Sequence, residues 1–229
     1  MSSPVRASSK LRAVATLLSV NLAHPRDNHG RTVRLTGIDK RPVTGPVRLD
    51  VPADGASGVG GDLIGDGSVH GGGDQAVYAY AREDLDTWSA ELGRPLAGGQ
   101  FGENLTTLGL DVTGALIGEH WRIGEVLLEV SAPRIPCATF TRWIGEPRWV
   151  KRFTERGLSG TYLRVLEPGQ VQAGDTVEVV HRPAHDVTIG VTFRALTTEP
   201  ELIHRLVGIE ALSAEIRAKV ARRTAGMVS

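Results

Sequence analysis

The chain has 229 residues, a length that favours one substantial hydrophobic core with room for a small appendage. Apolar residues make up 41% and charged residues 23%, as in ordinary globular proteins, and 26 basic residues balance 26 acidic ones. This balance excludes the overall positive field that draws a protein to nucleic acid or anionic lipid. No apolar stretch approaches the about 20 residues of a membrane span. We therefore expect no nucleic-acid and no membrane partner.

The N-terminal segment allows two interpretations. Arg6, Lys10 and Arg12 precede an apolar run, as in a short signal peptide. The same run has apolar or β-branched residues at every second position, which predicts a strand: Val14, Thr16, Leu18, Val20 and Leu22. We favour the strand. The chain has one cysteine and so cannot form an internal disulfide, which favours a cytoplasmic protein.

The first half of the chain predicts strands, a long loop and a helix. Residues 45–51 alternate between apolar and charged side chains, as in a half-buried strand. Residues 52–73 are rich in Gly and Asp and have no periodicity, so we expect a long loop, and such loops often bind ligands. Leu85, Trp88 and Leu92 recur at helical spacing before Gly93, which predicts a helix that ends there.

The second half predicts a hairpin and further strands. Residues 119–131 alternate on both sides of a turn at 124–125, and the second strand leads into Cys137. Trp149, Val150 and Phe153 predict one helical face that ends at Gly157. Residues 161–166 and 176–180 return to strand, separated by the turn-rich segment 167–175. Mostly strands with few helices predict a mainly β fold, a β-barrel with helical decoration.

The tail after residue 182 has helical patterns. Thr198 and Glu201 have the spacing of a capping box, and a second apolar stripe follows at Leu212, Ile216 and Val220. Residues 187–195 allow a further helix capped by Thr188, although an internal glycine and β-branched residues disfavour it. We therefore divide the chain into a barrel domain, residues 12–182, and a small C-terminal helical extension, residues 183–229.

Cys137 is a candidate metal ligand. Pro133 and Pro136 restrict the backbone around it, so the thiol is presented from a stiff loop at the end of a strand. A thiolate suits a soft metal, and a cofactor that brings its own sulfur ligands needs only one more from the protein. The alternative is a buried, inert cysteine, which is the commoner fate of a single free thiol.

Two glycine-rich segments are candidate ligand loops. His70 begins the segment HGGGDQ, in which Gly71 and its neighbours let several backbone N–H groups face an anion. A flexible turn explains the segment equally well. The same HGGG string occurs in serine hydrolases, but the accompanying G-x-S-x-G motif is absent here, which argues against that class. In the second segment, GGQFGEN at 98–104, Glu103 and Asn104 are candidates to hydrogen-bond a heterocycle, and a plain turn is the alternative.

Lys40 and Arg134 can neutralise a phosphate, the arginine with two hydrogen bonds, although solvated surface charges are the usual alternative. The sequence contains no C-x-x-C and no H-E-x-x-H motif, and no G-x-G-x-x-G opens a helix after a strand. Zinc binding and a Rossmann dinucleotide site therefore lack support.

Taken in order, these segments resemble the motifs of the MOSC domain family, which includes the C-terminal domains of molybdenum cofactor sulfurases. The similar segments are GIDKRPV at 37–43, VHGGGDQAVYAY at 69–80, GGQFGENLTTLGL at 98–110, IGEHWRIGEVLLEVSAPRIPC at 117–137 and AGDTVEVV at 173–180. GQFGEN and the ending PR-x-PC resemble the YiiM branch in particular, although Gln100 replaces the usual glutamate. The tail is similar to the three-helix extension of that branch.

The resemblance implies a MOSC β-barrel that binds the molybdenum cofactor, molybdopterin with molybdenum, with Cys137 as the protein ligand of the metal. It also implies a reductase of N-hydroxylated compounds, such as hydroxylaminopurines and amidoximes, which receives electrons from a separate flavin or iron–sulfur protein. A homodimer is compatible with this assignment.

From motif position and chemistry we expect Lys40 and Arg134 at the cofactor phosphate, Gly71 and Asn104 against the cofactor, and His70 as a hydrogen-bonding and proton-donating group. Two alternatives stay open. The chain could carry or sulfurate the cofactor without turning over a substrate, or Cys137 could act with His70 as a metal-free thiol enzyme.

Overall fold

The computed structural model describes residues 15–28, 35–68 and 70–225. The ends of the two assigned units, residues 12–14 and 226–229, lie outside the described residues, as does Val14 of the first predicted strand. The elements in chain order are β1 (Ala15–Ala23), β2 (Arg26–Asp27), β3 (Leu35–Thr36), β4 (Lys40–Pro42), β5 (Val47–Leu49), η1 (Gly73–Gln75), β6 (Val77–Ala81), α1 (Arg82–Leu92), β7 (Leu105–Leu108), β8 (His120–Ile123), β9 (Val126–Pro133), α2 (Ala138–Ile144), α3 (Trp149–Arg156), β10 (Thr161–Glu167), β11 (Gly169–Val171), β12 (Thr176–His181), α4 (Ile189–Leu196), η2 (Pro200–Leu206) and α5 (Ala214–Ala225).

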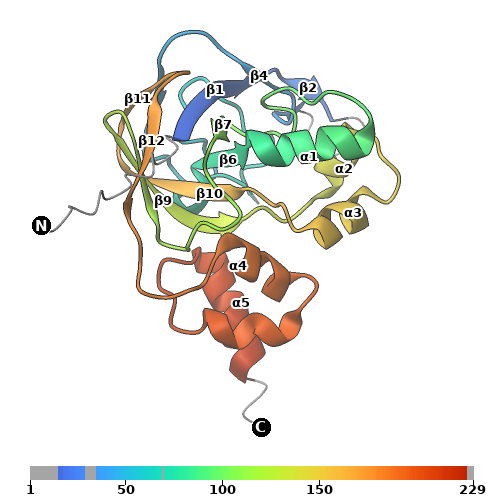
Figure 1. Cartoon of the computed structure of the whole chain (residues 1–229), viewed down its shortest axis with the longest axis vertical. Helices are drawn as coiled ribbons and strands as arrows, with labels where there is room; N and C mark the ends of the chain where they lie inside the picture. The colour runs from blue at the N-terminus through green and yellow to red at the C-terminus, as the bar shows by residue number, and fades with distance from the viewer. Residues whose placement is uncertain (1–14, 29–34, 69, 226–229) are drawn as a thin grey trace, which may run out of the picture.

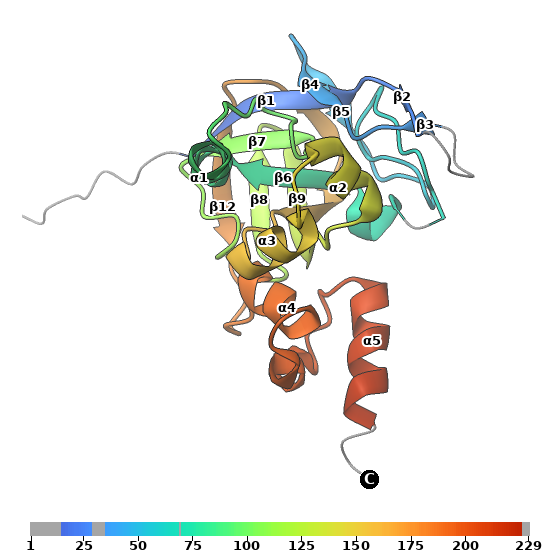
Figure 2. The ribbon, with the colours of Figure 1, turned by 90° about the vertical axis from the view of Figure 1, so that its right-hand side faces the viewer.

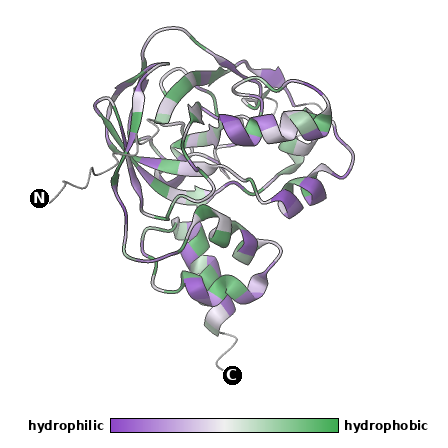
Figure 3. Cartoon of the chain, viewed as in Figure 1, coloured by the Kyte–Doolittle hydropathy of each residue, from purple (hydrophilic) through white to green (hydrophobic). Residues whose placement is uncertain are grey.

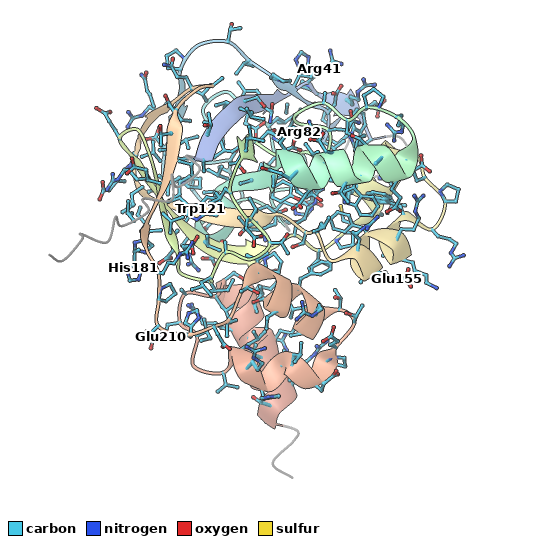
Figure 4. The ribbon with its side chains drawn as sticks, in the orientation of Figure 1. Arg41, Arg82, Trp121, Glu155, His181 and Glu210 are labelled. Atoms are coloured by element: carbon cyan, nitrogen blue, oxygen red, sulfur yellow. The ribbon has the colours of Figure 1, made fainter. Side chains whose placement is uncertain are left out.

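Seven strands close into a barrel, which confirms the predicted mainly β fold (Figure 1). Their order is β12-β8-β9-β10-β6-β7-β1, and β1 pairs back to β12. Neighbouring strands are antiparallel except β6 and β7, and β4 adds to the edge of β1. The predicted hairpin is formed by β8 and β9, whose pairing joins Ile123 to Val126 across a two-residue turn. Trp121 of this hairpin is fully buried in the barrel core, and Figure 4 labels it among the strands of the barrel.

The first strand, β1, forms as predicted, but the alternation gives the wrong face for part of it. The pairing of β1 with β7 shifts between Leu17 and Ser19, which indicates a bulge. Leu17 and Val20 are therefore buried, whereas Leu18, which the alternation assigned to the apolar face, is 37% exposed. One inserted residue moves every side chain before it to the opposite face of a strand.

A second hydrophobic core lies outside the barrel. Every residue of β6 is buried, because Val77 and Ala79 face the barrel interior while Tyr78 and Tyr80 face an aromatic cluster. The cluster also contains the rings of Trp88, Phe101, Phe140, Trp149, Phe153 and Phe193. Helices α1, α2 and α3, which contribute four of these rings, cover one side of the barrel (Figure 2). The few aromatic residues of the chain are thus concentrated where the helices pack on the sheet.

The helices α1 and α3 end as the sequence predicts, at Gly93 and Gly157 with left-handed backbone angles. On α3 only Trp149 and Phe153 are buried, and Val150 is 45% exposed. The prediction that Val150 lies on the same apolar face as these two residues is therefore wrong. The segment 167–175, expected to consist of turns, contains β11, which pairs with β5. Helix α2 was not predicted because its seven residues are too few to show a helical period.

The tail forms α4, η2 and α5 beside the barrel, and its helices carry apolar faces that share one buried core with the barrel (Figure 3). The uncertain helix α4 is present, and Thr188 accepts a hydrogen bond from the backbone N–H of Val191 at 3.1 Å. The predicted capping box is wrong, because η2 is a 3₁₀ helix that begins after Glu199 with no side-chain cap. None of the helices in the described ranges has the length and apolar character needed to cross a membrane.

Candidate functional site

A cavity of about 400 Å³ lies where four segments distant in sequence converge. It is lined by residues of 35–40, of the long loop and η1 within 57–76, of 102–104 and of 134–139, together with Tyr78 and Tyr162. The six residues that the family resemblance assigns to the site all line it: Lys40, His70, Gly71, Asn104, Arg134 and Cys137. The size suits a small-molecule site.

The thiol of Cys137 is held at the start of α2. The residue is half-buried and has extended backbone angles, and its carbonyl accepts the first hydrogen bond of the helix, from the N–H of Thr141 at 3.0 Å. Burial alone would raise the pKa of this thiol, but a hydrogen bond with His70, the charge of Arg134 and a backbone hydrogen bond with Phe140 more than offset burial and lower the pKa to about 6. Cys137 is therefore mostly a thiolate at neutral pH, the form that binds soft metals.

Arg134 is a buried cation with no carboxylate partner in the described part of the chain. It directly follows β9 and is only 7% exposed. Its guanidinium lies 4.2 Å from the ring centre of Phe140 and 5.0 Å from that of Tyr78, and it donates to the backbone carbonyl of Phe101. Burial opposes the charge, yet interaction with Tyr78 and other polar groups keeps the pKa of Arg134 above its ordinary value. A buried guanidinium that faces no carboxylate among the described residues, and has the Cys137 thiolate as a neighbouring charge, suits a further anion such as a phosphate.

Lys40 also lines the cavity, but its charge is already paired. Its Nζ lies 2.5 Å from both carboxylate oxygens of Asp62, and the two side chains are 8% and 1% exposed. Burial lowers the pKa of Lys40, and the charge of Asp62 partly counters this effect. Sequence reasoning missed Asp62, because nothing in the sequence distinguishes it from the other aspartates of the long loop, Asp54 and Asp66.

Asn104 is nearly buried, and its amide is used within the protein. Its Nδ2 donates to Asp62 at 2.9 Å, and its Oδ1 accepts from the backbone N–H of Tyr78 at 3.2 Å. Gln75, unlike Asn104, has a side-chain acceptor that is available to a ligand. It lines the cavity, and its Oε1 is buried and has no hydrogen-bond partner among the residues that the structure describes. The sequence analysis did not single out Gln75, although it belongs to the HGGGDQ segment.

The glycine loop brings His70 to the thiol. His70 is exposed at the cavity, where its side chain hydrogen-bonds with Cys137. Gly71 has a φ angle of 81°, and a Cβ at this position would lie 2.6 Å from the backbone oxygen of Ala56. Only glycine fits such a positive φ and close approach without strain.

Glu103 does not line the cavity, so the expectation that it hydrogen-bonds a heterocycle is wrong. It is fully buried, and its carboxylate accepts from the backbone N–H groups of Gly99 at 2.5 Å and Phe101 at 2.9 Å and from the Thr106 hydroxyl at 3.0 Å. Burial raises the pKa of Glu103. The carboxylate thus stabilises the loop to which it belongs, and the Phe101 carbonyl of this loop accepts a hydrogen bond from Arg134.

These groups fit a ligand with three properties. The thiolate of Cys137 suits a soft metal. Arg134, which has no carboxylate partner among the described residues, suits a phosphate, and the unpaired acceptor of Gln75 suits an N–H donor such as a pterin edge. No group of three or more His, Cys, Asp or Glu residues is placed to hold a metal in the described ranges. A metal bound at Cys137 therefore needs further ligands from a cofactor, and the residues present fit the molybdenum cofactor.

Comparison with known proteins agrees with this geometry. The MOSC domain model matches residues 66–178. YflK of Bacillus subtilis is 33% identical over 91% of this chain and 94% of its own length. A protein named Reductase from Gibberella moniliformis is 38% identical over 56% of this chain but only 23% of its own length. The crystal structure of YiiM from Geobacillus stearothermophilus has a TM-score of 0.75 at 30% identity and covers 91% of this chain and 98% of its own. The chain therefore belongs to the MOSC domain family and is similar to its YiiM members.

Proposed function

We propose that the chain binds the molybdenum cofactor in this cavity and reduces N-hydroxylated compounds, such as hydroxylaminopurines and amidoximes. The observation that carries the proposal is that one cavity holds both Cys137, a thiol of lowered pKa, and Arg134, a buried guanidinium with no carboxylate partner in the described part of the chain. Membership of the MOSC family supports the cofactor, and the name of the Gibberella relative supports reductive chemistry.

The roles of the residues follow from their chemistry. Cys137 supplies the thiolate ligand of the metal, Arg134 pairs with the phosphate, and Gln75 accepts a hydrogen bond from the pterin. When bound, the cofactor supplies the two electrons that convert an N–OH group to N–H. The reduction consumes two protons and releases the oxygen as water, and His70, at the cavity and beside Cys137, delivers a proton to that oxygen. The electrons come from a separate flavin or iron–sulfur protein.

The experiment is metal and pterin analysis of the protein expressed with molybdate in a host that makes the cofactor. We expect about one molybdenum per chain and reduction of benzamidoxime with an artificial electron donor. Cys137→Ser should lose the metal, and Arg134→Gln should weaken cofactor binding about 10- to 100-fold, as expected when a buried charged partner is removed. Arg122→Gln, which affects an exposed pair with Glu167, is the matched control.

Three outcomes contradict the proposal in different ways. Full molybdenum content in Cys137→Ser excludes the metal-ligand role. Cofactor binding without any turnover favours a carrier or sulfur-transfer protein. Activity in protein grown without molybdenum that is abolished by alkylation of Cys137 favours a metal-free thiol enzyme acting with His70.

A further inference from the structure

Asp74, at the end of the glycine loop, connects the cavity to the C-terminal helices. Its neighbour Gln75 lines the cavity, but its own carboxylate contacts two other segments. Oδ1 accepts from Nε of Arg164 on β10 at 2.7 Å, and Oδ2 accepts from the backbone N–H of Ala214, the first residue of α5, at 2.6 Å. The carbonyl of Asp74 accepts from the hydroxyl of Ser131 on β9 at 2.6 Å. One residue is thus held by β9, β10 and α5.

Arg164 extends the connection to the segment before α5. Its Nη1 donates to Glu129 at 2.6 Å and to the carbonyl of Ala211 at 2.8 Å, and its Nη2 donates to the carbonyl of Leu212 at 3.2 Å. The N-terminus of α5 carries the positive end of the helix dipole, which favours the carboxylate of Asp74 there. Figure 2 shows η1 and the first turn of α5 on the same side of the barrel.

The three glycines of the loop, Gly71, Gly72 and Gly73, have no side chains that could hold the backbone in place. Gly71 and Gly72 have φ angles of 81° and 76°, and a Cβ at Gly73 would meet no atom within 4 Å. Glycines in such a run lose more backbone freedom on ordering than any other residues, so the order of the loop depends on its anchors. Asp74 is the charged anchor at its C-terminal end.

We propose that Asp74 is a positioning residue through which the C-terminal helices hold the glycine loop, residues 70–75, against the ligand cavity. The proposal rests on the proposed function only in that the cavity is the ligand site. When the contact with α5 is lost, the loop samples more conformations, and ligand binding must then also order it, so the affinity falls. The C-terminal extension therefore supports the binding site from outside, although none of its described residues lines the cavity.

Ala214→Pro tests the contact with little other change. A proline at the first position of a helix keeps the helix and removes only the N–H that donates to Asp74. Asp74→Asn, which removes the charge and keeps the shape, is the second variant should the first fail to fold. Ser213→Ala is the matched control, because Ser213 caps the same helix, with its hydroxyl 3.4 Å from the N–H of Ile216, and the N–H of Ala214 remains.

The primary measurement is hydrogen exchange of residues 70–75 in protein free of cofactor, read by mass spectrometry. We expect about tenfold faster exchange of this loop in Ala214→Pro and Asp74→Asn, and wild-type exchange of the loop in Ser213→Ala even where α5 itself exchanges faster. In protein loaded with cofactor, the first two variants should lose molybdenum on dialysis about tenfold faster than the control.

Loop exchange that is unchanged in both Asp74→Asn and Ala214→Pro overturns the proposal, as does an equal increase in all three variants, which would reflect only the stability of the tail. Equal rates of molybdenum loss in the variants and the control overturn it too. Wild-type protein that binds no molybdenum contradicts the proposed function, whereas the exchange experiment still decides the role of Asp74.

Discussion

Replacement of Glu103 should destabilise the protein strongly, because this carboxylate holds the second glycine loop together from the inside. Glu103→Ala leaves three donors without partners in a fully buried place: the N–H groups of Gly99 and Phe101 and the hydroxyl of Thr106. A buried donor without a partner costs about 1–3 kcal/mol. The raised pKa of Glu103 shows that its buried charge is itself costly, and losing that charge offsets part of the damage. We expect a loss of about 3–5 kcal/mol in the free energy of unfolding.

Urea denaturation followed by tryptophan fluorescence measures this loss, since Trp88 and Trp149 lie in the aromatic cluster that contacts the same loop. Glu103→Gln keeps one acceptor oxygen and should lose about half as much. Glu167→Ala, whose partner Arg122 is on the surface, should change stability by less than about 1 kcal/mol. A loss below about 1 kcal/mol for Glu103→Ala would refute the reasoning, because it would mean that the three donors find other partners.

Three further predictions test the electrostatics and the tail. Burial and the neighbouring Asp111 raise the pKa of Asp84 from 3.8 to about 6. The folded protein therefore binds this proton more tightly than the unfolded chain, so its stability should fall as the pH rises from about 4 to 6, by up to about 3 kcal/mol. Asp84→Asn should remove this dependence in denaturation curves, whereas a slope as in the wild type would contradict the assignment. The alkylation rate of Cys137 by iodoacetamide should reach half its maximum near pH 6, and Arg134→Gln should move the midpoint upward; a wild-type midpoint near 9 would exclude the thiolate. Thr188→Ala removes the cap of α4 and should cost about 1 kcal/mol in thermal or urea unfolding, and no change would show that the cap is not needed.

Patterns within one element of the sequence were sufficient for much of the fold. The spacing of Leu85 and Trp88 and the glycine at 93 predicted α1, because a helix of this length has a period and a left-handed C-terminal residue that are both local. The alternation around residues 124–125 predicted the hairpin for the same reason. Motif order placed six candidate residues, and all six line one cavity.

Patterns that depend on a partner strand or on a short segment were less informative. The bulge after Leu17 arises where β1 pairs with β7, so the alternation of β1 alone assigned Leu18 to the wrong face. Helix α2, which places Cys137, is too short to show its own period.

The sequence by itself thus determined most of the residue types that line the site. Only the tertiary structure decided which of their charges are paired with a partner. The sequence presents Lys40 as a free cation, but the structure pairs it with Asp62, 22 residues away. Arg134 instead contacts a backbone carbonyl and aromatic rings and has no carboxylate partner among the described residues. The carboxylate of Glu103 accepts hydrogen bonds within its own loop, and that of Asp74 accepts one from the first residue of α5, 140 residues away. A charge is free or paired according to what folding brings next to it, and the spacing of residues along a chain does not contain that information.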